Sequence, residues 1–176
     1  MNDRFNEQEI KSKEKIMSAN ITRKLAGKVA LVTGGSRSIG AAIAKRLATD
    51  GAAVALTYSA SPDKANEVVR SIEAAGGKAL AIKADAADTE AVRLAVAKTI
   101  GTFGAIDILV NNVQPGPIDT DMNPADSDFA KTLVPITALQ RYGNTDEIAS
   151  FVAYLASPEA SYITGASLLA DGGFAA

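Results

Sequence analysis

The sequence predicts an α/β protein built on a doubly wound parallel sheet, and three observations lead to this prediction. Short, nearly continuous apolar runs alternate with longer amphipathic runs, in the order β-α-β-α-β-α-β up to residue 112. Apolarity on both faces is typical of parallel strands that are covered by helices on each side. Glycines or a Ser-Pro pair punctuate the ends of the runs. A chain of 176 residues, 47% hydrophobic, is long enough for one domain with a core.

Each element is justified by its own pattern. Ser61 and Pro62 begin the second helix as N-cap and first helical residue. The third helix is expected to bury Val92, Val96, Ile100 and Phe103 on one side. The predicted strands are residues 29–32, 52–58, 78–85, 105–112 and a last one at 165–173; the predicted helices are 41–51, 61–77, 88–104 and 144–157, the last capped by Asn144 or Thr145.

Composition excludes several classes of function. Cysteine and histidine are both absent, so there is no disulfide, thiol nucleophile or histidine-based proton shuttle, and we expect no metal site. The formal net charge is −2 without a basic run, which argues against nucleic acid as a partner. No apolar run is long enough to cross a bilayer, and the N-terminus has no signal-peptide pattern. We therefore expect a cytoplasmic protein with no membrane partner, whose residues 1–26 form a flexible leader before one domain at 27–176.

A glycine-rich turn joins the first predicted strand to the first predicted helix. Its sequence is TGGSRSIG, from Thr33 to Gly40. A loop in this position directs backbone N–H groups and the positive end of a helix toward a phosphate. The position after the first strand of a β-α-β unit makes this signal much stronger than the glycines alone. The sequence therefore predicts a nucleotide site here.

The chain resembles the classical short-chain dehydrogenase/reductase (SDR) family, with 3-oxoacyl-carrier-protein reductases as the nearest general plan. The family's first motif is TGxxxGxG, and Thr33, Gly34 and Gly40 match it, whereas Ser38 replaces the middle glycine. The segments KADAAD, LVNN, VQPGPIDT and the tail from Arg141 onward also match, in the family's order. The resemblance implies a Rossmann-type sheet, a nicotinamide cofactor and a homo-oligomer, either a dimer or a tetramer.

The cofactor residues follow from the glycine turn and from this resemblance. The second strand ends without an acidic residue that would hold a ribose 2′-hydroxyl, whereas Arg37 offers a cation to a 2′-phosphate, so NADP is the predicted cofactor. The resemblance places Asp85 at the adenine, Asn112 at the adenosine ribose and 115–120 beside the nicotinamide. The predicted cofactor-binding residues are Gly34, Ser36, Arg37, Ser38, Ile39, Gly40, Tyr58, Ser59, Asp85, Ala86, Asn112, Pro115, Gly116 and Ile118.

The family's catalytic residues are missing. In the family, a Tyr protonates the substrate oxygen and a Lys four residues later lowers its pKa. Here the positions four residues after the four tyrosines hold Pro62, Asp146, Pro158 and Ala166. Two strand–helix units of the family are absent, roughly 60 residues or more at about 30 per unit. They fall at an apparent internal gap between residues 112 and 113.

Three hypotheses explain this gap: the functional protein carries a segment that this chain lacks, the deletion is real, or the chain is a minimal binding domain. We favour the first, because without the segment the fourth strand would be an exposed apolar edge. The predicted function is hydride transfer between NADP and a carbonyl or secondary alcohol, by the protein with its segment. The alternative is a non-catalytic regulator, since VQPGPIDTDMNPAD resembles SDR-like proteins that bind a cyclic dinucleotide.

Overall fold

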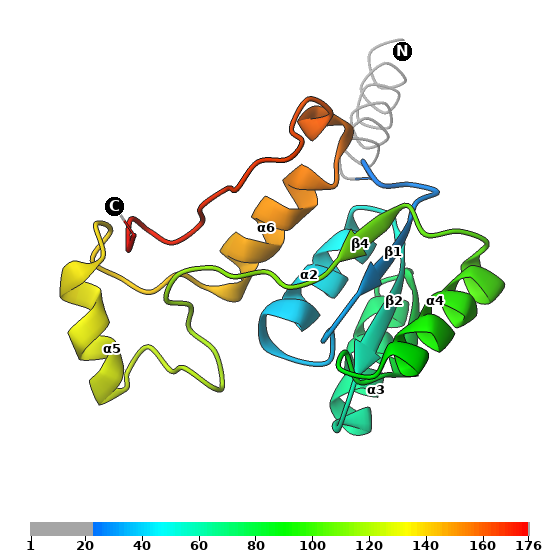
Figure 1. The fold of residues 1–176 in the computed structure, drawn as a ribbon, viewed down its shortest axis with the longest axis horizontal. Helices are drawn as coiled ribbons and strands as arrows, with labels where there is room; N and C mark the ends of the chain where they lie inside the picture. The colour runs from blue at the N-terminus through cyan, green and yellow to red at the C-terminus, as the bar shows by residue number, and fades with distance from the viewer. Residues whose placement is uncertain (1–22, 176) are drawn as a thin grey trace, which may run out of the picture.

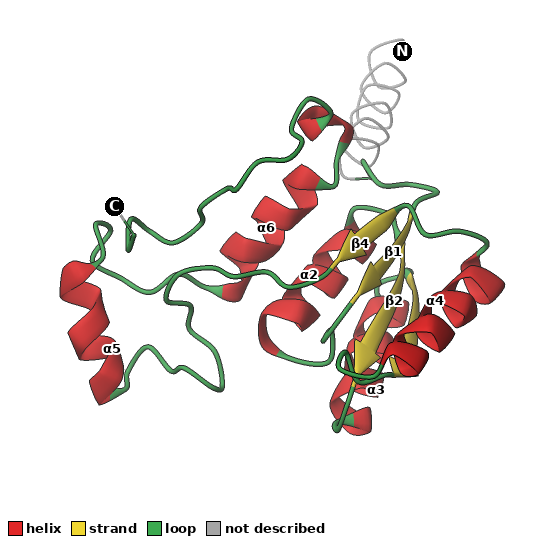
Figure 2. Ribbon diagram, in the orientation of Figure 1, coloured by secondary structure: helices red, strands yellow, loops and turns green. Residues whose placement is uncertain are grey.

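The computed structural model describes residues 23–175 and consists of a four-stranded parallel sheet with helices on both faces (Figures 1 and 2). The strands lie in the order β3-β2-β1-β4. The strands are β1 (Val29–Val32), β2 (Ala53–Tyr58), β3 (Lys78–Lys83) and β4 (Ile108–Val110); the helices are α2 (Ser38–Thr49), α3 (Pro62–Ala74), α4 (Thr89–Phe103), α5 (Asp128–Leu133) and α6 (Thr145–Leu155). Short 3₁₀ turns lie at Val134–Ile136 and Pro158–Ala160. The doubly wound α/β prediction is confirmed.

The two faces of the sheet carry separate apolar cores. On one face, α2 and α3 cover β1, β2 and β3, and α6 packs against α2; Leu47 and Leu56 are completely buried in this core. On the other face, α4 alone packs against the sheet, through a smaller cluster around Leu31, Ala55 and Ala95. The two central strands, β1 and β2, are buried on both sides, which explains their near-continuous apolar runs.

The parallel register brings the carboxyl ends of the strands to one edge. Val32 pairs with Leu56 on one side and with Val110 on the other. The loops that follow β1, β2 and β4 therefore meet, which is where ligands bind in open parallel sheets. Residues 33–40 follow β1 at this edge, as the sequence predicts.

The C-terminal helix α6 is fixed by a complete capping box. The Asn144 side chain accepts a hydrogen bond from the Glu147 N–H at 2.9 Å, and the Glu147 carboxylate accepts one from the Asn144 N–H at 2.9 Å. Arg141 donates two further hydrogen bonds to the same carboxylate, at 2.9 and 2.7 Å. The Arg141 hydrogen bonds and the Asn144 N–H lower the pKa of Glu147 to about 2. The capped helix packs against α2, which follows the glycine turn.

Three sequence-based expectations are corrected. Residues 165–173 form no strand, because no neighbouring strand lies beside them in the described part of the chain; Leu169 is 74% exposed. Ser61 is the N-cap residue of α3 and Pro62 its first residue, as predicted, but the Ser61 side chain does not make the capping hydrogen bond expected of it. In α4, Val96 and Phe103 are half-buried against the smaller core, as predicted, but Val92 and Ile100 are exposed. The residues that this helix buries are Ala95 and Thr99.

The predicted leader lies mostly outside the described residues. Its last part, residues 23–26, is packed: Leu25 is 1% exposed, and its N–H donates to the Asp50 carbonyl at 2.8 Å. Ordered structure therefore begins before Gly27.

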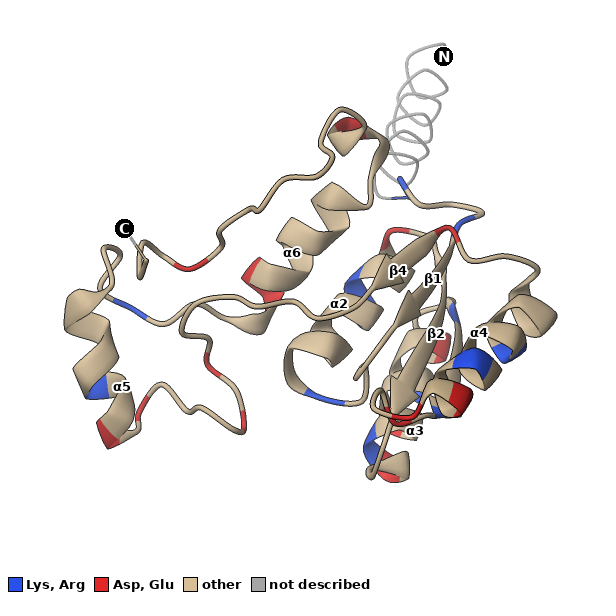
Figure 3. Cartoon of the chain, viewed as in Figure 1, with Lys and Arg blue, Asp and Glu red and all other residues tan. Residues whose placement is uncertain are grey.

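Within residues 23–175, no helix combines the length and apolarity that a bilayer crossing needs. Figure 3 shows basic and acidic residues scattered over the described chain, with several acidic residues in succession in the loop before α5.

Candidate functional site

The glycine turn is held by the three strands around it. The Thr33 N–H donates to the Val110 carbonyl at 3.0 Å, which ties the turn to β4. The N–H groups of Gly34 and Gly35 donate to the hydroxyl and the carbonyl of Thr57, at 3.1 and 2.9 Å, which tie it to β2. The first half of the turn is thus fixed to protein, and its second half leads into α2.

Close packing explains why glycine stands at Gly40. A Cβ atom there would overlap the carbonyl oxygen of Gly34, so the first turn of α2 can approach the turn only without a side chain. Ser38, which replaces the family's middle glycine, has a φ of +47°, in the left-handed region that glycine adopts most easily. Ser38 accepts this backbone conformation and donates its hydroxyl to the Asp121 carboxylate.

The N-terminus of α2 leaves amide groups open. Its N-cap residue is Arg37, whose side chain makes no capping hydrogen bond. The first helical hydrogen bond runs from the Ala41 N–H to the Arg37 carbonyl, so the N–H groups of Ser38, Ile39 and Gly40 have no acceptor within the helix. By contrast, Asp88 caps α4 through two N–H groups. Free N–H groups and the helix dipole together attract a phosphate.

Two cations lie beside this helix end. Arg37 and Lys64 both approach the Asp121 carboxylate at 3.4 Å. The Ser38 hydrogen bond lowers the pKa of Asp121, with further lowering from Lys64 and Arg37. Sequence reasoning missed Lys64 and Asp121; the signal for Lys64 was its place just after β2, in the first turn of α3.

The other residues predicted around the adenosine half end β2 and β3. Tyr58 is half-buried against the main core, and its carbonyl accepts a hydrogen bond from the Ala84 N–H at 2.9 Å. Ser59 is exposed one residue further on. Asp85 and Ala86 are exposed after β3, and the Asp85 carboxylate accepts from the Ala87 N–H at 3.0 Å. Ser36 is half-buried inside the glycine turn. All five lie at the carboxyl edge.

The predicted nicotinamide segment leaves this edge after Asn112, which is exposed with a φ of +55°. Gly116 packs so closely on Asp171 that a side chain would not fit there. Ile118 is buried in the main core and bridges to Gly143, so its side chain supports the segment. From there the chain runs away from the sheet toward α5 (Figure 1). Pro115, half-buried, begins this departure.

Asn111, which the prediction omitted, contacts the glycine turn. The Thr33 hydroxyl donates to its side-chain oxygen at 2.9 Å. The only sequence signal was its position as the first residue after the apolar run of β4. Thr33 and Asn111 therefore close one side of the turn, opposite Thr57.

Neither a catalytic pair nor a metal centre is assembled by the described residues. Tyr142 is buried and donates to the Asn123 side-chain oxygen at 3.3 Å, and Tyr162 is completely exposed. Between residues 23 and 175 no group of three acidic residues could hold a metal ion. The described site offers the open N–H groups of α2 and the cations Arg37 and Lys64.

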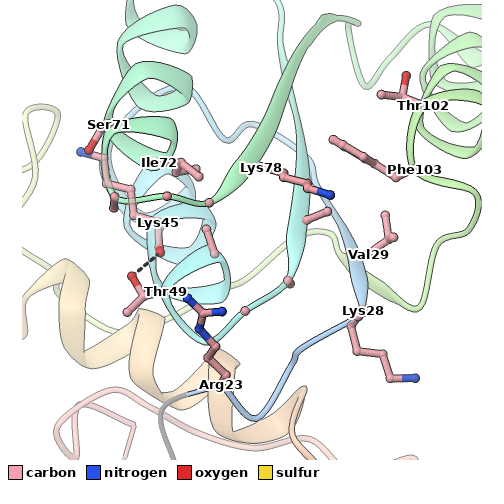
Figure 4. Close-up of a pocket in the computed structure, with 18 residues that line it drawn as sticks. Arg23, Lys28, Val29, Lys45, Thr49, Ser71, Ile72, Lys78, Thr102 and Phe103 are labelled. Atoms are coloured by element: carbon pink, nitrogen blue, oxygen red, sulfur yellow. Dashed lines mark hydrogen bonds between the residues drawn. The ribbon is translucent and has the colours of Figure 1, made fainter. Parts of the chain in front are cut away.

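A cavity of about 570 Å³ lies at the opposite, amino edge of the sheet (Figure 4). It is lined by the residues that begin the strands and end the helices, among them Arg23, Lys45 and Lys78. None of the predicted cofactor residues lines it. Lys28 at its rim extends outward and pairs with Asp107 at 3.2 Å.

Comparisons with known proteins agree with this fold and this site. The family profile described as short chain dehydrogenase matches residues 28–114, and the profile described as enoyl-(acyl carrier protein) reductase matches residues 108–175. An uncharacterized oxidoreductase of Methylorubrum extorquens is 54% identical over 89 residues, which are 51% of this chain and 36% of the relative. The chain thus spans about a third of the length of that relative.

Two further proteins match over most of their length. The cyclic-di-GMP-binding biofilm dispersal mediator protein of Escherichia coli is 32% identical over 232 residues, covering 85% of this chain and 98% of the relative. A short chain dehydrogenase from Burkholderia cenocepacia, solved in complex with NADP, has a TM-score of 0.84 and 34% identity, covering 87% of this chain and 100% of that one.

These matches also locate the difference in length. The E. coli protein aligns over 232 residues, whereas 85% of this chain is only about 150 residues, so roughly 80 positions of the relative have no counterpart here. The two family profiles overlap at residues 108–114, which contain the junction between Asn112 and Val113. A glycine turn between β1 and α2, a parallel sheet in the order β3-β2-β1-β4 and these matches together show that the chain belongs to the short-chain dehydrogenase/reductase family.

Proposed function

We propose that this chain is the nucleotide-binding part of an NADP-dependent oxidoreductase, which transfers hydride between the nicotinamide and a carbonyl or secondary alcohol. The observation that carries the proposal is the open N-terminus of α2 at the carboxyl edge of the sheet, with Arg37 beside it. The protein would act on a small molecule, without nucleic acid or membrane, as a cytoplasmic dimer or tetramer.

The preference for NADP rests on charge. β2 ends at Tyr58 and is followed by Ser59, so the strand end itself supplies no carboxylate that would hold a ribose 2′-hydroxyl. Arg37 and Lys64 place two cations on that side, and guanidinium groups bind phosphate through paired hydrogen bonds. The NADP complex of the Burkholderia cenocepacia relative supports this choice.

The residues of this chain would bind and orient the cofactor. The N–H groups of Ser38, Ile39 and Gly40 would hold the diphosphate, and Arg37 with Lys64 would hold the 2′-phosphate. When bound, the nicotinamide supplies the hydride. The residue that protonates the substrate oxygen is missing from these 176 residues, since none of the four tyrosines has a Lys four positions later.

We therefore propose that the functional protein carries a further segment between Asn112 and Val113. The roughly 80 unmatched positions of the E. coli relative support this. The exposure of Leu109 on β4, 62%, supports it too, because a further strand would cover this edge.

The mass of the natural protein tests this segment. If about 60–80 residues are present, intact mass spectrometry of the protein isolated from its source will give a value about 6–8 kDa above 18.1 kDa. Peptides from the insertion will join the sequence of β4 to that of 113–118. A measured mass of 18.1 kDa would mean that the shorter chain is itself the functional product.

Substitution of Arg37 tests the cofactor preference. We expect Arg37→Ala to weaken NADPH binding about tenfold, because one charge-assisted hydrogen bond contributes about 1.5–3 kcal/mol. NADH, which lacks the 2′-phosphate, should lose less than about twofold. Fluorescence titration measures both. Arg93→Ala removes the same charge from α4 and serves as the control. Equal losses for both nucleotides would contradict the assignment of Arg37.

The second candidate is a regulator that binds a nucleotide without turnover. The 32% identity with the cyclic-di-GMP-binding mediator of E. coli, over 98% of that protein, favours it. Oxidation of NADPH with a panel of ketones separates the two candidates when it is measured on the protein with its segment. Turnover supports the oxidoreductase; micromolar binding of cyclic-di-GMP without turnover supports the regulator.

A further inference from the structure

The carboxylate of Asp121 occupies the positive mouth of the glycine turn. One of its oxygens accepts the hydroxyl hydrogen bond of Ser38, and the other lies 3.4 Å from both Arg37 Nη1 and Lys64 Nζ. Arg37, Ser38 and Lys64 come from the glycine turn, α2 and α3, whereas Asp121 follows them in the chain by 84, 83 and 57 residues. A single acidic side chain thus gathers the donors around the site.

The turn that carries Asp121 is anchored on both sides. Thr120 and Asn123 form an antiparallel bridge, so residues 121 and 122 are the tip of a tight turn. Before it, the Asp119 N–H donates to the Gly143 carbonyl at 2.9 Å, and after it Asn123 accepts the Tyr142 hydroxyl at 3.3 Å. The position of Asp121 is therefore built into the fold of the segment.

The contacts of Asp121 are those that a phosphate would make. A carboxylate and a phosphate are both anionic acceptors of hydrogen bonds from guanidinium, ammonium and hydroxyl groups. The side chains of Arg37, Lys64 and Asp121 are 44%, 53% and 42% exposed, so a ligand can reach them from solvent. Exposed ion pairs are weak, which allows a stronger anion to displace this one.

We propose that Asp121 is an internal competitor of the cofactor phosphates and sets how strongly this site favours NADPH over NADH. The proposal deepens the proposed function and rests on it. The ligand must take Arg37 and Lys64 from Asp121, and the carboxylate that remains nearby repels the extra charge of a 2′-phosphate. Asp121 is thus a specificity-determining residue that lowers the affinity for the more highly charged nucleotide.

Substitution by the isosteric amide isolates the charge. Asp121→Asn keeps an oxygen that can accept from Ser38 but loses attraction for both cations. We expect NADPH to bind about three- to tenfold more tightly and NADH to gain less, since exposed pairs contribute modestly. Asp126→Asn removes the same charge five residues later, and its carboxylate makes no hydrogen bond to Arg37 or Ser38 among the described residues. It should change both affinities equally and by less than about 1.5-fold.

A probe without nicotinamide separates this inference from the proposed function. We expect pyrophosphate to raise the thermal midpoint of Asp121→Asn more than that of the wild type. If pyrophosphate raises the thermal midpoint of Asp121→Asn more than that of the wild type while neither nucleotide binds, Asp121 competes with an anion at this site and the proposed cofactor is wrong. If NADPH binds the wild type and Asp121→Asn equally well, or the Asp126→Asn control gains as much, the inference is overturned while the proposed function stands. If neither pyrophosphate nor a nucleotide binds Asp121→Asn differently from the wild type, the inference is overturned as well.

Discussion

Gly40→Ala is expected to destabilise the protein by about 1–3 kcal/mol, because a methyl group must be inserted where there is no room. The atom that it meets is the carbonyl oxygen of Gly34, part of the backbone, which cannot rotate away as a side chain would. Relief requires a shift of the first turn of α2 against the glycine turn. Such a shift moves the amides of Ser38 and Ile39, so NADPH binding should fall at least about tenfold. Chemical unfolding and fluorescence titration measure the two effects.

Gly101→Ala provides the matched control. Gly101 also lies in a helix, α4, but a Cβ atom there would have no heavy atom within 4 Å. Neither glycine has a positive φ, so alanine fits the backbone conformation at both positions. Replacing an unconstrained helical glycine by alanine stabilises by about 0.5–1 kcal/mol. The two substitutions should therefore change stability with opposite signs. Gly40→Ala that is as stable as Gly101→Ala would contradict the close packing of the turn.

The sequence predicts the β-α half of the fold well, because local pattern and tertiary environment agree there. Val29–Val32 is apolar at every position and is buried at every position. The same logic fails in α4, where apolar residues are found all round the helix and the pattern cannot choose a face. Val92 and Ile100 are exposed because the sheet beside β4 has no further strand or covering helix among the described residues.

The tail shows the same limit. The pattern of 165–173 is typical of a strand, yet a strand needs a hydrogen-bonding neighbour, and local sequence does not say whether one exists. Here Leu168 and Leu169 are exposed and no ladder forms. Strand formation is a property of pairs, so a segment whose own residues suit a strand stays irregular where no partner strand lies beside it.

The sequence predicts the site residues that belong to the glycine turn itself. It does not predict the residues that distant segments bring to the turn. The open helix end and Arg37 follow from the eight residues 33–40. Asp121 and Lys64 reach the same place through tertiary folding, and no spacing in the sequence links them to Arg37. Ser38 is intermediate: the motif marks its position as unusual, and the structure gives the cause, a φ of +47°.

Leu47→Ala and Leu94→Ala compare how much a leucine contributes to stability in helices on the two faces of the sheet. Both replace leucine by alanine inside a helix, so the change in helix propensity is similar. Leu47 in α2 is completely buried in the main core, and its truncation should cost about 2.7–5 kcal/mol. Leu94 in α4 is 60% exposed, and its truncation should cost less than about 0.5 kcal/mol in the 176-residue chain. Urea unfolding measures both free energies.

The same pair distinguishes the 176-residue chain from the proposed longer protein. A further strand–helix unit beside β4 would also bring a helix next to α4, since each face of a doubly wound sheet is covered in full. Leu94 would then be buried, and Leu94→Ala should cost about 2 kcal/mol or more in the longer protein, while the cost at Leu47 stays unchanged. The exposure of Leu94 in the 176-residue chain would then follow from the absence of the helix that it contacts in the longer protein. If Leu94→Ala does not change the free energy of unfolding of the longer protein, the added segment does not cover α4. The apolar face of this helix then serves another contact.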